Sequence, residues 1–116
     1  MRTYILGLLL MAGPAWAHDA VIDRATARET ASGWSFSVTL THPETGWDDY
    51  ADGWRVETEA GEVLGTRVLA HPHVNEQPFT RSLSGVDVPD GTSTVWRRAK
   101  TLVDGWGQER LKLDLP

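Results

Sequence analysis

The feature that most constrains the fold is a period-two alternation of apolar and polar residues that recurs along the chain. It is clearest at positions 34–41, where Trp34, Phe36, Val38 and Leu40 alternate with serine and threonine. Successive side chains of a β-strand point to opposite faces, so this pattern predicts a strand with one buried face. No segment places apolar residues at helical spacing over three turns. We therefore expect an all-β protein.

Further strands are predicted wherever the alternation returns between turn-forming residues such as Ala60-Gly61 and Pro89-Asp90-Gly91. Their ranges are 54–58, 62–69, 79–83, 94–99 and 111–115, with a weaker pattern at 20–28. Short strands separated by turns predict a single antiparallel immunoglobulin-like β-sandwich of about seven strands. A small β-barrel is the alternative. Trp34 and Trp54 each begin an alternating apolar face and are predicted to lie in the core.

The N-terminal residues have the three parts of a secretory signal. Arg2 is followed by an apolar run, and Ala15-Trp16-Ala17 places small residues before a cleavage site. The run is shorter than the ~20 residues of a spanning helix, so no membrane span is expected after cleavage. We predict a signal peptide at 1–17, cleavage between Ala17 and His18, and one β-sandwich domain at 18–116. The mature protein is expected in the periplasm or secreted.

Charge and composition argue against several classes of function. The chain carries 11 basic and 16 acidic side chains, for a net charge of −5, which argues against a nucleic-acid partner. It contains no cysteine, which excludes disulfides, thiolate metal sites and cysteine nucleophiles. Ser82 and Ser84 lack the G-x-S-x-G context of a nucleophilic serine. We expect a binding protein that is not an enzyme.

All four histidines fall at the predicted mature N-terminus or in two long loops, 42–52 and 71–78. Pro72 favours an extended backbone before it, which would set the imidazoles of His71 and His73 on one side, ~6.6 Å apart. His18 would add an α-amine beside its imidazole. Such a nitrogen-rich set suits Cu(II), with Zn(II) as second choice. We predict a copper site of His18, His71 and His73, with His42 as a further ligand, that holds or delivers the metal.

An alternative function rests on the aromatic residues of the loops. Trp47, Tyr50 and Trp106 would form a recognition surface for a ligand or another periplasmic protein, and the histidines would then be structural. In either case Glu76 and Arg81 are predicted to pair and to hold the loop that carries His71 and His73.

Two segments resemble a family of small secreted bacterial β-sandwich proteins of uncharacterised function. They are HPHVNEQPFTRSLSG at 71–85 and TGWDDYADGW at 45–54. The resemblance implies a sandwich but no activity. Members of that family often carry His-Gly-aromatic-Gly where this chain has Asp104-Gly105-Trp106-Gly107, which implies Asp104 as an oxygen ligand of the metal. An N-terminal histidine on a periplasmic β-sandwich is also similar, in architecture only, to the copper-binding CopC-type proteins.

Overall fold

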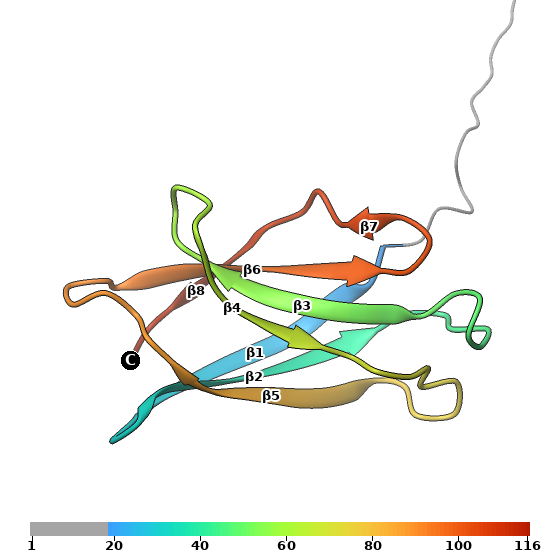
Figure 1. Ribbon diagram of the computed structural model, residues 1–116, viewed down its shortest axis with the longest axis horizontal. Coiled ribbons are helices and arrows are strands. Elements are labelled where there is room, and N and C mark those ends of the chain that lie inside the picture. The colour runs from blue at the N-terminus through green and yellow to red at the C-terminus, as the bar shows by residue number, and fades with distance from the viewer. Residues whose placement is uncertain (1–18) are drawn as a thin grey trace, which may run out of the picture.

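The computed structural model describes residues 19–116, which form eight strands in two facing antiparallel sheets and contain no helix (Figure 1). The predicted signal peptide, its cleavage site and His18 lie outside the described residues. The strands are β1 (Val21–Thr30), β2 (Gly33–Thr41), β3 (Ala51–Glu57), β4 (Val63–Val68), β5 (Phe79–Val86), β6 (Thr94–Thr101), β7 (Gly105–Trp106) and β8 (Leu111–Asp114).

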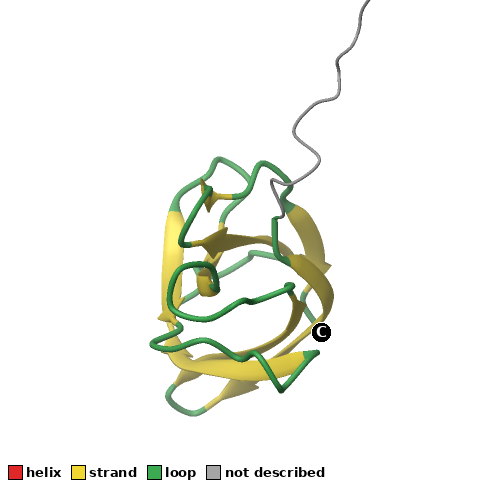
Figure 2. Cartoon of the chain, turned by 90° about the vertical axis from the view of Figure 1, so that its right-hand side faces the viewer, coloured by secondary structure: helices red, strands yellow, loops and turns green. Residues whose placement is uncertain are grey.

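One sheet has the order β1-β2-β5, and the other has the order β4-β3-β6-β7, with β8 also paired to β6. The chain crosses between the sheets after β2, after β4 and after β5, as expected for an immunoglobulin-like sandwich. The prediction of an antiparallel β-sandwich is confirmed. The barrel alternative is wrong, because the two sheets stay open and do not close into one (Figure 2).

The core lies between the sheets and is built from the apolar positions of the alternating segments. Phe36, Val38 and Leu40 of β2 are at most 1% exposed, and Trp54 of β3 is fully buried. Trp34 is partly buried and packs against this cluster. Each aliphatic or aromatic side chain fully withdrawn from water contributes roughly 1.5–3 kcal/mol, so this layer stabilises a domain that has no disulfide.

The structure differs from the predicted strands where the alternation is interrupted. β3 begins at Ala51 rather than at 54, because its register with β6 shifts between Ala51 and Gly53. β5 continues to Val86, and its register with β2 shifts between Trp34 and Phe36. Such bulges move side chains from one face to the other and hide the strand from a period-two pattern. β7 spans two residues and is too short to show a period.

A buried carboxylate joins strands β3 and β6 to the segment that precedes β8. Glu57 is 1% exposed and accepts hydrogen bonds from Arg55 Nε at 2.6 Å and from Arg110 Nε at 2.9 Å. Arg98 Nε lies 3.3 Å from the same carboxylate. Burial acts to raise the pKa of Glu57, but the two hydrogen bonds and the nearby guanidinium charges outweigh it and lower the pKa.

Antiparallel order brings distant loops to one end of the sandwich. The connections β2–β3, β4–β5 and β6–β7 lie at the right-hand end in Figure 1, where β1 also begins. Figure 2 looks onto this end and shows the loops side by side. We call this end of the sandwich, with its β2–β3, β4–β5 and β6–β7 connections, the loop end; it contains the candidate site.

Among residues 19–116 there is no helix long and apolar enough to cross a membrane.

Candidate functional site

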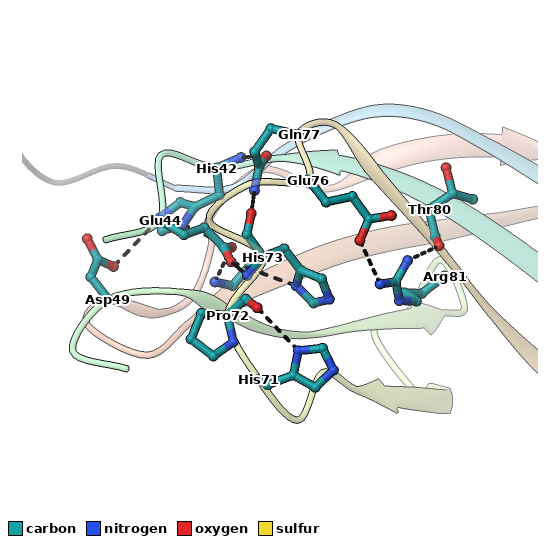
Figure 3. A network of polar contacts seen from close by, with 11 residues as sticks. His42, Glu44, Asp49, His71, Pro72, His73, Glu76, Gln77, Thr80 and Arg81 are labelled. Atoms are coloured by element: carbon teal, nitrogen blue, oxygen red, sulfur yellow. Dashed lines mark hydrogen bonds and ion pairs between the residues drawn. The ribbon is translucent and has the colours of Figure 1, made fainter. Parts of the chain in front are cut away.

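A buried glutamate holds two loops of the loop end together. Glu44, in the β2–β3 loop, is 7% exposed, and its side chain is wholly buried. Its Oε2 accepts the backbone N–H of Ala51 at 2.7 Å, and its Oε1 accepts the backbone N–H of His73 at 2.6 Å (Figure 3). Hydrogen bonds from backbone N–H groups to an ionised carboxylate are among the stronger ones in proteins. Glu44 therefore fixes the β4–β5 loop against the start of β3.

His42 follows the last residue of β2 and is fully buried. Its Nδ1 lies 3.4 Å from Glu44 Oε2, and its Nε2 lies 3.7 Å from Asp49 Oδ1. Its backbone N–H donates to Gln77 Oε1 at 3.0 Å, and Gln77 Nε2 donates to the carbonyl of His73 at 2.9 Å. His42 thus belongs to a polar network that ties the two loops together beneath the surface (Figure 3).

His73 also lies against Glu44 and is almost fully buried. It is 5% exposed, and its ring stacks on Phe79 with 4.0 Å between centroids and 13° between planes. Its Nδ1 lies 3.8 Å from Glu44 Oε1, and neither ring nitrogen has a hydrogen-bond partner. Burial lowers the pKa of His73, and the Arg81 charge lowers it further. The neutral imidazole is therefore favoured.

His71 stands beside His73 as the sequence predicts, but it is exposed. The two ring centroids are 4.8 Å apart and the rings are tilted by 41°. His71 Nδ1 lies 3.2 Å from the carbonyl oxygen of Pro72. Both imidazoles line an open cavity of about 530 Å³, whose other walls are Gly46, Trp47, Pro72, Val74, Asn75 and Glu76.

Of the remaining predicted residues, Glu76 lies at the cavity, whereas Asp104 and Trp106 lie in the β6–β7 turn and in β7. Glu76 accepts a hydrogen bond from Arg81 Nη2 at 3.0 Å, so these two side chains form an ion pair at the start of β5. Asp104 is exposed in the β6–β7 turn, where its backbone N–H donates to Thr101 Oγ1. Trp106 lies on the five-stranded sheet, with the Arg55 guanidinium 4.0 Å from its ring centroid.

Trp47 and Tyr50 meet at the loop end. Trp47 is 66% exposed, and its ring contacts that of Tyr50 edge to face, with 5.7 Å between centroids. The Tyr50 carbonyl accepts the backbone N–H of Leu102 at 2.9 Å, which links the β2–β3 loop to the β6–β7 turn. The structure thus brings Trp47 and Tyr50 into contact, whereas the Trp106 ring contacts the Arg55 guanidinium.

Of the four histidines predicted as copper ligands, the structure describes three, because His18 lies outside residues 19–116. Within that range, no group of three or more histidine, aspartate or glutamate side chains has an arrangement that could hold a metal ion. His71 and His73 are adjacent, whereas His42 is turned into the Glu44 network.

Sequence analysis did not identify Glu44, Asp49 or Gln77 as members of the site. They lie 29, 24 and 4 positions from His73 in the sequence, and no motif spacing joins them. The one available signal was the clustering of every described histidine in the two loops that these residues also occupy. That signal locates the region of the site but does not predict which side chains contact the histidines.

Comparison with known proteins adds one relative. No protein-family model and no solved structure matches the chain. A protein of Halomicrobium mukohataei named "Putative lipoprotein" is 47% identical over 79 residues. The aligned part covers 68% of this chain but 38% of that protein, so the chain spans well under half of the relative's length.

Proposed function

We propose that the protein is exported and acts as a non-catalytic binding protein that holds or delivers Cu(II) through His71 and His73. Export is supported by the signal-like pattern of residues 1–17 and by the name of the 47% identical relative. From that name we carry over only the export.

The observation that carries the metal proposal is the pair of imidazoles in the wall of the cavity. His73 is buried and has two ring nitrogens without a hydrogen bond, and the His71 ring is 4.8 Å away. A buried polar group without a partner is costly, and a bound metal ion would satisfy one of these ring nitrogens. The lowered pKa of His73 favours the neutral imidazole, which is the form that binds a metal.

Two imidazoles leave coordination positions for further donors. In the proposal these come from the α-amine and imidazole of His18, with Asp104 or His42 as a further ligand. A nitrogen-rich set without thiolate prefers Cu(II) over Zn(II) in the general order of divalent-metal affinities. Since the ligands must be deprotonated, copper affinity should fall as the pH drops, and the lowered pKa of His73 places its part of the loss below the ordinary imidazole range.

Copper titration of protein that begins at His18 tests this function, with affinity read from the Cu(II) absorbance band. We expect His71→Ala, and a variant with one extra residue before His18, each to bind at least about tenfold more weakly, a loss of ~1.4 kcal/mol. Asp90→Asn, at the opposite end of the sandwich, serves as the control and should bind like the parent. Equal, weak binding by the parent and both site variants would overturn the proposal.

A second candidate function is recognition of a ligand or partner by the loop aromatics. It is favoured by Trp47, which is 66% exposed and forms one wall of the cavity that contains His71 and His73. Isolated exposed apolar residues are common, but a tryptophan exposed to this degree beside a cavity is a typical contact residue of interfaces. This candidate becomes the leading one if the copper titration fails.

A further inference from the structure

The turns at the two ends of the sandwich differ in composition. At the loop end, the Asp49 N–H bonds to the Gly46 carbonyl and the Glu76 N–H to the His73 carbonyl, so Trp47 and Val74 each follow the first residue of a turn. The third turn lies between the paired residues Thr101 and Gly105 and begins with Leu102 and Val103. Turn tips usually carry Gly, Pro, Asn, Asp or Ser. Here three of them begin with large apolar side chains.

These apolar side chains are exposed. The exposed fraction is 66% for Trp47, 62% for Val103, 49% for Val74 and 47% for Leu102. The tips are also neighbours, because Trp47 and Val74 line the same cavity and Tyr50, which contacts Trp47, bonds to Leu102. Exposed apolar groups gathered in one region, unlike those scattered singly, mark a surface that contacts a membrane or a protein.

The opposite end provides an internal comparison. Its three turns have Ala31-Ser32, Glu59-Ala60 and Asp90-Gly91 at their tips. None of these is a large apolar residue. Both ends belong to the same acidic domain. The β2–β3 and β4–β5 connections are longer than those at the opposite end, but the β6–β7 turn is short and still begins with two exposed apolar residues.

Charge and shape indicate what the tips contact. Asp48 and Asp104 are exposed beside Trp47 and Val103, and neither forms an ion pair within residues 19–116. The turns at 46–49, 73–76 and 101–104 contain no lysine or arginine. Carboxylates without basic residues match the ammonium groups of zwitterionic lipids and are repelled by anionic lipids.

Side chains that project from separate turns also suit a fluid lipid interface better than a protein partner. A protein would have to offer a complementary hollow for each projecting side chain, whereas lipid rearranges around them. Tryptophan and tyrosine, here in contact as Trp47 and Tyr50, are the residues most enriched at membrane–water interfaces. We propose that the loop end inserts Trp47, Val74, Leu102 and Val103 into the interface of a zwitterionic lipid surface. This binding does not require the metal, so the two proposals can fail separately.

Co-sedimentation of the metal-free protein with phosphatidylcholine vesicles tests the proposal, beside vesicles of phosphatidylglycerol. We expect binding to phosphatidylcholine and weaker binding to phosphatidylglycerol. The double variant Trp47→Ser/Val103→Ser should lose about tenfold or more in vesicle affinity, since both side chains are withdrawn from water on binding. Val63→Ser is the matched control, because Val63 is 48% exposed in β4 at the opposite end.

Circular dichroism of each variant verifies that the sandwich remains folded. The proposal is overturned if the parent protein does not sediment with phosphatidylcholine, which is the result expected if the tips contact only a protein. Stronger binding to phosphatidylglycerol than to phosphatidylcholine, or equal losses in the double variant and in Val63→Ser, would overturn it as well.

Discussion

Replacing Glu44 by alanine is expected to release the β4–β5 loop and to destabilise the domain. The carboxylate accepts two backbone N–H groups, from Ala51 at 2.7 Å and from His73 at 2.6 Å. A buried donor left without its acceptor costs about 1–3 kcal/mol, so the two together cost roughly 2–6 kcal/mol of unfolding free energy. Domains of this kind have a total stability of only ~5–15 kcal/mol, so the loss is a large fraction of it.

Urea denaturation followed by tryptophan fluorescence measures this loss, and Glu44→Gln provides the matched comparison. Glutamine keeps the shape and one acceptor oxygen but turns an N–H₂ group toward the other donor, so we expect about half the destabilisation of alanine. Amide hydrogen exchange should show faster exchange at Ala51 and His73 in both variants. A loss below ~1 kcal/mol in Glu44→Ala, with both amides still protected, would refute the role assigned to this carboxylate.

Two further predictions concern the scaffold. Glu57→Gln leaves the guanidiniums of Arg55, Arg98 and Arg110 around an uncharged amide, and chemical denaturation should show a loss of about 3–5 kcal/mol at neutral pH. The pKa of Glu57 is lowered from its usual 4.5, so the ionised side chain contributes its full stabilisation of the fold above that value. This stabilisation should disappear as the pH falls through the folded-state pKa. An unchanged acid unfolding midpoint in Glu57→Gln would contradict this. Gly33→Ala should lower the thermal unfolding midpoint more than Gly61→Ala. Both glycines have positive φ, but only at Gly33 would a Cβ lie 2.9 Å from a backbone oxygen, that of Val86. Equal shifts in the two variants would show that this close approach does not matter.

Much of the fold could be predicted from sequence, because a strand with one buried face has alternating apolar and polar residues. At 34–41 apolar and polar residues alternate strictly, and the structure places Phe36, Val38 and Leu40 in the core. The alternation does not identify β7, which is too short to show a period, or the start of β3, where a register shift interrupts it.

The candidate site was predictable only in outline. The loops that carry the histidines could be located, because they lie between well-defined strands, and the adjacency of His71 and His73 follows from their spacing across Pro72. Whether a histidine in such a loop is exposed or buried depends on residues distant in sequence. His71 is exposed and His42 is buried, although each is followed by proline.

Local patterns predict every strand of residues 19–116 except β7, together with the buried faces and the turns, because each depends on neighbours a few residues apart. The strand order is needed to know which turns lie at the same end of the sandwich and which side chains meet there. Glu44 reaches His73 across 29 residues, and Trp47 stands near Val74 and Leu102, because three crossings of the chain between sheets return separate loops to one place. Contacts of this kind follow from strand order and register, which no local period records.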